Sequence, residues 1–306
     1  MAENTPTLHN RIQDARRRLE RAGIEPSEAA LDAQLLARHA LGGWERGQLI
    51  AGMRDPVPAG FDEAFEPLVR RREAREPTAY ITRHREFWNI EIAVAPGVLV
   101  PRPETEFIVE EVIDRVPDGI GAWRIADVGT GSGCLAVALA RWLPAALVTA
   151  IDESPVALAM AARNVTAHGV AARVSLVRGD LLDTHRGPFD VIVSNPPYVP
   201  AGDIPTLPRE VRDYEPVGAL DGGPDGLGII RRLVPQAASR LVDGGWLVFE
   251  FGFGQRDGVR AIVKAEPMLE LIAVREDLAG IPRVAVAQRR FAASGPSPES
   301  RIPNPD

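Results

Sequence analysis

From Trp123 onward, short apolar runs alternate with amphipathic segments, and this alternation constrains the fold more than any other feature. Such alternation predicts a parallel β-sheet covered by helices. The expected strands are 124–128, 147–152, 174–177, 190–193 and 245–251. The expected helices are 134–143, 154–168, 227–241 and 255–265. Segments 268–276 and 283–290 are expected to close the sheet as an antiparallel pair, so the predicted fold class is α/β, Rossmann-like and mostly parallel.

The residues before the sheet predict a small helical bundle. Apolar residues recur at helical spacing in segments 7–22, 26–41 and 61–75. In the second helix we expect Leu31, Leu35, Leu36 and Leu41 to form one apolar face. The basic run 70–72 is expected to form a solvated face of the third helix.

Residues 77–101 lack the helical spacing of the preceding segments and are expected to form strands. Tyr80–Thr82 and Ile90–Val94 are rich in β-forming residues and flank Glu86-Phe87-Trp88, which predicts a hairpin-like linker. Residues 199–226 are rich in Pro, Gly and Asp and predict a long loop.

These patterns divide the chain into four parts. We expect a helical domain at 1–76, the linker at 77–101, the α/β domain at 102–291, and a tail at 292–306. The tail is rich in proline, and we expect it to be disordered.

Composition narrows the class of protein. The chain has 306 residues and a formal net charge of −7, which gives no reason to expect nucleic-acid binding. No apolar run is long enough to span a membrane, and the N-terminus has no signal-peptide pattern. Cys134 is the single cysteine, and no metal-ligand spacing occurs. We therefore expect a cytoplasmic protein that holds no metal.

A glycine-rich turn follows the first expected strand, at Gly129-x-Gly131-x-Gly133. Dinucleotide-binding proteins require G-x-G-x-x-G, and position 134 here is cysteine. Asp127 stands just before the glycines, where a carboxylate would repel a pyrophosphate. A ligand with a cationic ammonium or sulfonium group suits that position.

Two further acidic residues extend this pattern. Asp152 ends the second strand, where it can accept both hydroxyls of a ribose. Asp180 follows the third strand and can bind an adenine amine, while Leu181 offers a backbone N–H and an apolar flank. Together these residues predict S-adenosylmethionine as the cofactor and a methyltransferase domain as the α/β fold.

The tetrad Asn195-Pro196-Pro197-Tyr198 comes at the carboxyl end of the strand at 190–193, where open α/β sheets bind ligands. The prolines fix φ and remove two donors, which leaves the Asn195 side-chain oxygen and the Asn195 and Pro196 carbonyls as acceptors. Such a site suits an N–H₂ group, and the ring of Tyr198 can lie against a flat substrate. No His or Glu is expected beside the tetrad as a strong base.

Most of the chain resembles the PrmC/HemK-type release factor glutamine methyltransferases. The resemblance rests on the tetrad and on these segments: Glu76–Thr82, Glu86–Trp88, Val100–Glu106, Tyr214–Pro216, Gly222–Leu227, Glu250–Gly252 and Asp277–Gly280. It implies methyl transfer to the side-chain amide of the glutamine in the Gly-Gly-Gln motif of peptide chain release factors. It also implies that the helical bundle helps to hold the release factor.

The resemblance implies roles for individual residues. The expected cofactor contacts are Gly129, Thr130, Gly131, Ser132, Gly133, Asp152, Leu181 and Asn195. The expected catalytic residues are Asn195, Pro196 and Tyr198, and the expected glutamine pocket is formed by these three together with Pro197.

Three alternatives stay open from the sequence. A glutamine of ribosomal protein L3 is the substrate of a closely related class. A DNA or RNA amino-methyltransferase would use the same tetrad on a flipped adenine, but it would need a basic groove for phosphates. A scaffold that only binds the cofactor would have no use for the acceptors of the tetrad.

Overall fold

The computed structural model describes residues 6–116, 121–185 and 187–291. The tail at 292–306, which we expect to be disordered, lies outside these residues. The chain divides into two compact units, Met1–Pro101 with Gly202–Leu220, and Arg102–Ala201 with Asp221–Asp306.

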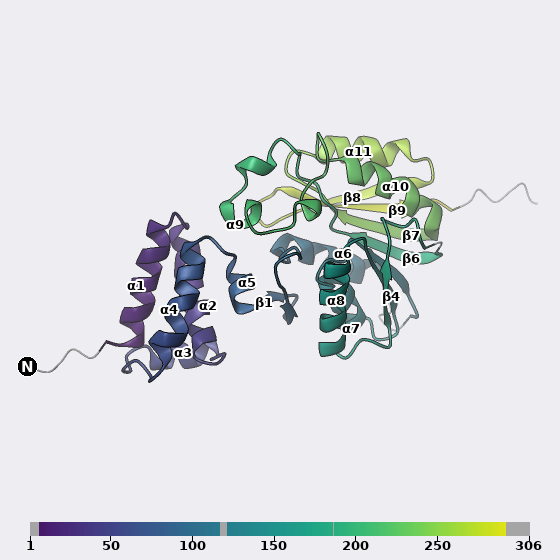
Figure 1. Cartoon of the computed structure of the whole chain (residues 1–306). Helices are drawn as coiled ribbons and strands as arrows, with labels where there is room; N and C mark the ends of the chain where they lie inside the picture. The colour runs from purple at the N-terminus through teal and green to yellow at the C-terminus, as the bar shows by residue number, and fades with distance from the viewer. Residues whose placement is uncertain (1–5, 117–120, 186, 292–306) are drawn as a thin grey trace, which may run out of the picture. The chain divides into compact units, whose positions relative to one another are not determined.

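The first unit is the predicted helical bundle (Figure 1). Its main helices are α1 (Leu8–Arg21), α2 (Pro26–Ala40), α3 (Arg46–Gly52) and α4 (Phe61–Glu73). Three of them were expected, and the short α3 was not. The prediction for Leu31 is wrong, because its side chain is 56% exposed. The buried face of α2 contains Ala29, Ala33 and Leu36, which lie on one side of a helix at 3.6 residues per turn.

Arg72 on α4 corrects the prediction of a solvated basic face. Its side chain is only 1% exposed and pairs with the buried Asp32 of α2 at 2.6 Å. It also pairs with Glu28 at 2.8 Å and with Glu210 at 3.3 Å. The sequence shows three adjacent arginines, but a helix turns each of them by about 100° relative to the one before, so only one points into the bundle.

The linker contains the predicted hairpin, with β1 (His84–Phe87) paired antiparallel to β2 (Ile90–Ala93). The prediction of a strand at Tyr80–Thr82 is wrong, since this segment lies in the short helix α5 (Thr78–Thr82). The helical turn allows Ile81 to enter the core of the bundle. It also allows the buried Tyr80 hydroxyl to donate to the Val98 carbonyl at 2.7 Å.

The expected loop at 199–226 contains three short helical elements, η2 (Ile204–Thr206), α9 (Arg209–Arg212) and η3 (Val217–Ala219). Glu210 of α9 accepts from Arg72 and Arg75 of the bundle. The Tyr214 hydroxyl donates to the Ala74 carbonyl at 2.8 Å. These contacts explain why residues 202–220 belong to the helical unit although they follow the tetrad in the sequence.

The second unit contains a seven-stranded sheet in the order β5-β4-β3-β6-β7-β9-β8. Its strands are β3 (Arg124–Val128), β4 (Leu147–Asp152), β5 (Val174–Arg178), β6 (Phe189–Ser194), β7 (Leu241–Glu250), β8 (Leu269–Glu276) and β9 (Pro282–Arg289). The first five strands in that order are parallel, and β9 is antiparallel to both β7 and β8. The predicted fold class is confirmed.

Helices cover both faces of this sheet (Figure 1). Helices α6 (Glu106–Arg115), α7 (Cys134–Trp142) and α8 (Pro155–Ala167) pack side by side on one face. Helices α10 (Gly228–Arg240) and α11 (Arg256–Ala265) pack on the other. Within the described residues, none of the helices combines the length and the apolar character needed to span a bilayer.

The order in which strands are added to the sheet changes sides at β3. From β3 it moves to β4 and β5 on one side, and later to β6 and β7 on the other. The pairing of Val128 with Ser194 brings the carboxyl ends of β3 and β6 together. Open α/β sheets bind their ligands at such a switch point.

We predict that Arg72→Met lowers the free energy of unfolding of the helical unit by about 3–5 kcal/mol, because it leaves Asp32 as an uncompensated buried charge. Urea unfolding with circular dichroism measures the change. Arg70→Ala is the matched control, since Arg70 is 73% exposed and its pair with Glu66 is worth less than about 1 kcal/mol. Equal losses in the two variants would contradict the buried role of Arg72.

Candidate active site

The glycine-rich turn lies directly after β3 and has an unusual backbone. Gly129, Gly131 and Gly133 all have positive φ, at 74°, 55° and 80°. A Cβ added at Gly129 or Gly131 would meet no atom within 4 Å. The glycines therefore provide both the left-handed turn and an open approach to the loop backbone, as a cofactor-binding turn requires.

Asp127 stabilises this turn through hydrogen bonds from residues of the turn and of the helix that follows it. Its side chain is 1% exposed, and Oδ2 accepts from Thr130 Oγ1 at 2.6 Å and from the Ala136 backbone N–H at 3.1 Å. Oδ1 is buried and receives no hydrogen bond from any described residue. Burial raises the pKa of Asp127 to about 7. Oδ1 is thus the atom that a donor or a cation would satisfy, although its contact with a cofactor stays a prediction.

Thr130 and Ser132 contribute to the turn differently from the glycines. Both side chains are buried. Thr130 bonds to Asp127, and the Ser132 carbonyl accepts from Asn164 Nδ2 at 2.8 Å. These two residues therefore stabilise the shape of the turn, and they would offer a ligand their backbone rather than their hydroxyls.

Asp152 lies beside the turn at the end of β4. Its Oδ2 accepts from the Gly131 backbone N–H at 2.8 Å, and its Oδ1 accepts from the Ser154 N–H at 2.9 Å. The Asp152 carbonyl accepts from Gly179 N–H at 3.1 Å. The structure therefore brings together three segments that the sequence predicts as parts of one cofactor site, the glycine turn, Asp152 and the residues after β5.

The segment after β5 has a constrained backbone. A Cβ at Gly179 would lie 2.3 Å from Thr184 Oγ1, so a larger residue there would require the Thr184 side chain to move. Leu181 has a φ of 52°, a strained conformation for a leucine that is typical of ligand sites. Asp180 is exposed and pairs with Arg232 of α10 at 2.5 Å, a partner that the sequence did not indicate. The adenine contacts of Asp180 and Leu181 stay predictions.

The tetrad follows β6, at the other side of the switch point. The Asn195 side chain donates through Nδ2 to Thr105 Oγ1 at 2.9 Å, and its Oδ1 has no donor among the described residues. Pro196 is buried, and Pro197 and Tyr198 are half-buried. The side-chain acceptor that the sequence predicts is therefore available at Asn195.

Glu250 corrects the expectation that no Glu lies beside the tetrad. It ends β7, the neighbour of β6, and is fully buried. Its Oε1 accepts from the Tyr198 hydroxyl at 2.8 Å, and its Oε2 accepts from Thr105 Oγ1 at 2.7 Å. Residue spacing could not reveal this contact, because Glu250 lies 52 positions from Tyr198. The sequence gives two signals for Glu250, an acidic residue at the end of an apolar strand and its place in the segment Glu250–Gly252 that carries the family resemblance, but neither indicates its contact with Tyr198.

Burial changes the titration of this cluster. It raises the pKa of Glu250 to about 7, although the hydrogen bonds from Thr105 and Tyr198 act in the opposite direction. Burial and the nearby Glu250 carboxylate raise the pKa of Tyr198 well above its usual value. Tyr198 therefore acts as a hydrogen-bond donor at neutral pH rather than as a phenolate.

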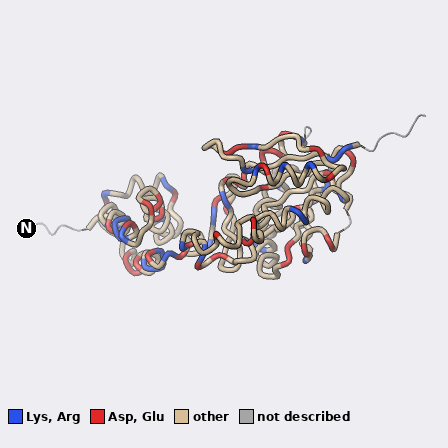
Figure 2. Tube along the Cα trace, turned by 90° about the horizontal axis from the view of Figure 1, so that it is seen from above, with Lys and Arg blue, Asp and Glu red and all other residues tan. Residues whose placement is uncertain are grey.

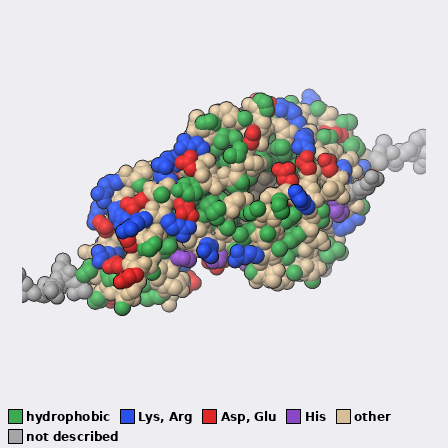
Figure 3. Space-filling view, viewed as in Figure 1, with side chains coloured by type: hydrophobic (Ala, Val, Ile, Leu, Met, Phe, Trp, Pro, Cys, Tyr) green, Lys and Arg blue, Asp and Glu red, His purple; other side chains and the backbone are tan. Residues whose placement is uncertain are grey.

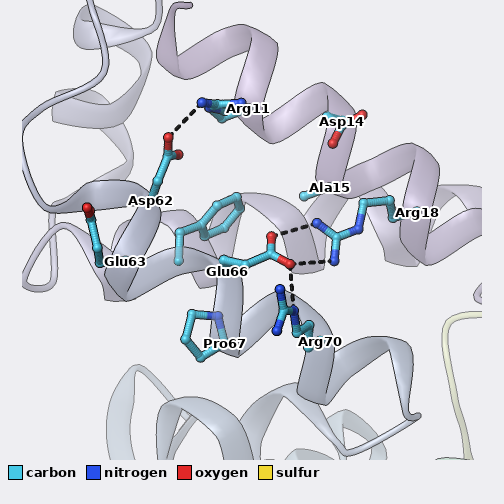
Figure 4. Close-up of a pocket in the computed structure, with 10 residues that line it drawn as sticks. Arg11, Asp14, Ala15, Arg18, Asp62, Glu63, Glu66, Pro67 and Arg70 are labelled. Atoms are coloured by element: carbon cyan, nitrogen blue, oxygen red, sulfur yellow. Dashed lines mark hydrogen bonds and ion pairs between the residues drawn. The ribbon is translucent and has the colours of Figure 1, made fainter.

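A separate groove of about 470 Å³ lies between α1 and α4 of the helical unit (Figure 4). Its charged residues are largely paired with one another. Arg11 bonds to Asp62 at 2.6 Å, and Glu66 bonds to Arg18 at 2.7 Å and to Arg70 at 2.8 Å. None of the predicted site residues lines this groove.

Acidic and basic residues are mixed along the chain in both units (Figure 2). The visible surface of the helical unit shows the same mixture (Figure 3). The absence of nucleic-acid binding stays a prediction, and the mixed charges agree with it.

Comparisons with known proteins place the chain in a family. The protein-family model for the PrmC N-terminal domain matches residues 11–82, and the family model for the methyltransferase small domain matches residues 105–206. A release factor glutamine methyltransferase of Moorella thermoacetica is 41% identical, over 93% of this chain and 99% of that protein. One of Geobacter sulfurreducens is 42% identical, over 91% of this chain and 95% of that protein.

Solved structures support the fold alone. The hMettl16 catalytic domain in complex with MAT2A 3′UTR hairpin 6 is similar with a TM-score of 0.55 and 17% identity. The similarity covers 71% of this chain and 81% of that chain.

The raised pKa of Asp127 predicts a dependence of stability on pH. An unfolded Asp titrates at about 3.9, so between that pH and about 7 the folded state holds a proton that the unfolded state has lost. The stabilising contribution is complete below about pH 3.9 and falls by about 1.4 kcal/mol per pH unit until about pH 7. We expect Asp127→Asn to remove this part of the slope between pH 5 and 7, measured by urea unfolding without cofactor.

The control for this experiment is Asp203→Asn, because Asp203 is exposed. It should leave the slope of the wild type unchanged. An unchanged slope in Asp127→Asn would show that Asp127 is ionised in the folded protein throughout this range.

Proposed function

The chain belongs to the release factor glutamine methyltransferases, and from this membership we propose how its own residues carry out the reaction. The enzyme transfers a methyl group from S-adenosylmethionine to a glutamine of a peptide chain release factor. We propose that the acceptor is the side-chain amide nitrogen of the glutamine in the Gly-Gly-Gln motif. The observation that supports this most strongly is the free Oδ1 of Asn195 at the switch point of the sheet.

The residues around β3, β4 and β5 fit this cofactor, which supplies an electrophilic methyl group on a sulfonium. The open backbone at Gly129 and Gly131 allows close approach, and the unpartnered Asp127 Oδ1 offers an acceptor. We propose that Asp152 binds the ribose hydroxyls. We propose that Asp180 and Leu181 bind the adenine, which requires Asp180 to share or exchange its pairing with Arg232.

The proposed role of the tetrad follows from the chemistry of an amide. A carboxamide nitrogen is a weak nucleophile because its lone pair is delocalised into the carbonyl. We propose that Asn195 Oδ1 and the Pro196 carbonyl each accept one N–H of the substrate and orient its nitrogen. Positive charge that develops on this nitrogen strengthens both bonds in the transition state, which accelerates the reaction, and the methylated amide becomes neutral when it gives up one N–H proton to solvent. The ring of Tyr198 would lie against the glutamine side chain and exclude water.

We propose that residues 1–76 form the domain that recognises the release factor, that 77–101 form the linker, and that 102–291 form the catalytic domain, with residues 202–220 as the part of that domain that groups with the helical unit. Residues 202–220 begin four positions after Tyr198 and belong to this unit. The chain therefore links the proposed glutamine pocket directly to the proposed recognition unit. Because release factors act where ribosomes translate, we propose the cytoplasm as the compartment.

The experiment that tests the proposed substrate is transfer of labelled methyl from S-adenosylmethionine. Four acceptors are compared: a release factor, the same factor with the Gly-Gly-Gln glutamine changed to alanine, ribosomal protein L3, and duplex DNA. We expect label on the intact release factor alone. Label on the alanine variant would contradict the proposed glutamine, and preferential label on L3 or DNA would contradict the proposed substrate.

The same assay tests the tetrad through Asn195→Ala. We expect this variant to react on the order of a hundredfold more slowly, the scale of a lost transition-state hydrogen bond. Circular dichroism is the control for folding, and calorimetry should show that cofactor binding stays measurable, although Asn195 is itself an expected cofactor contact. Normal turnover in this variant would remove Asn195 from the proposed mechanism.

A further inference from the structure

We propose that Thr105 and Glu250 are positioning residues that determine which atom of the Asn195 side chain faces the substrate. This inference rests on the proposed function, because it explains how the pocket comes to accept an amide N–H₂. The two residues do not contact the substrate in this account. They act through Asn195, which Thr105 contacts directly and Glu250 contacts through Thr105.

The protons available to Glu250 and Thr105 determine the orientation of the Asn195 side-chain amide. An ionised Glu250 has no proton, so both of its oxygens accept. Thr105 has one hydroxyl proton, which it donates to Glu250 Oε2 at 2.7 Å. Thr105 Oγ1 can then only accept from Asn195, so the Asn195 amide must turn its N–H₂ toward Thr105 at 2.9 Å. Asn195 Oδ1 therefore faces away from Thr105, where it can accept from an N–H of the substrate.

Burial makes this direction persistent. Thr105 is 2% exposed and Glu250 is fully buried, so water does not compete for either group. The second oxygen of Glu250 is also occupied, because the Tyr198 hydroxyl donates to Oε1 at 2.8 Å. One carboxylate therefore aligns both the acceptor and the aromatic ring of the tetrad.

Protonation of Glu250 would reverse the direction of the hydrogen bonds that run from Asn195 through Thr105 to Glu250. A protonated Glu250 can donate to Thr105, which then has its own proton free to donate to Asn195 Oδ1. The Asn195 amide would rotate and present N–H₂ to the pocket, where it would repel the N–H₂ of glutamine. Among the described residues, the charged and titratable groups that interact with Glu250 are Tyr198, Glu104 and Arg283, together with Cys134, the first residue of α7. Arg283 favours the ionised form and Glu104 opposes it.

The first test compares Thr105→Val with Thr105→Ser in single-turnover methylation of the release factor at saturating cofactor. Valine has nearly the shape of threonine but cannot bond to Asn195. We expect Thr105→Val to slow the reaction at least about tenfold with cofactor affinity unchanged, and Thr105→Ser to restore most of the rate. Equal, wild-type rates in both variants would overturn the proposal, as would equally low rates.

The second test is the pH profile of the same single-turnover rate, which a purely structural role would not change. In the wild type we expect the rate to fall about tenfold per pH unit below a pH near 7, as Glu250 gains its proton. Glu250→Gln has no carboxyl to titrate, so we expect a slower rate without this acid limb. An acid limb that persists in Glu250→Gln would overturn the proposal, even if Thr105→Val fails to fold.

These tests are distinct from the test of the proposed function. If the wild type does not methylate the release factor, the proposed function fails. If the wild type does so but the Thr105 and Glu250 variants keep its rate and its pH profile, only the present inference fails.

Discussion

The parallel pairing of β3 with β6 is the contact on which the site depends. These strands are far apart in the chain, yet Val128 lies beside Ser194 in the sheet. The residue after Val128 opens the glycine turn, and the residue after Ser194 is Asn195. A shift of register by one residue would exchange the faces of the strand and separate the two halves of the site. The apolar strands therefore set the geometry between cofactor turn and acceptor tetrad.

Two buried carboxylates orient the groups on either side of the switch point, and their burial lowers the stability of the fold. Asp127 supports the turn from one side of the switch point, and Glu250 supports the tetrad from the other. Burial raises the pKa of each to about 7, so each is costly to ionise. Hydrogen bonds from hydroxyl groups offset part of that cost. The same buried environment keeps the bonds free of competition from water, which a site that selects an amide requires.

Much of the fold was predictable because strand and helix periodicity in the second half of the chain is regular. The strand at 124–128, the helix expected at 154–168 and the antiparallel closing pair all appear as expected. The errors arise where long-range contacts override local pattern. Tyr80 lies in a helix because its hydroxyl reaches Val98, and Arg72 is buried because Asp32 lies opposite it. The contacts of Glu250 escaped prediction for the same reason, since its partners Tyr198 and Thr105 come from distant segments.

The most direct test of the account is a structure of the enzyme with the methylated release-factor glutamine and S-adenosylhomocysteine. The transferred methyl group marks the amide nitrogen, so its position identifies the acceptors without ambiguity. The account predicts this nitrogen within about 3.2 Å of Asn195 Oδ1 or the Pro196 carbonyl, with Asn195 Nδ2 still on Thr105. A methylated nitrogen that lies against Glu250, or away from both acceptors, would contradict it.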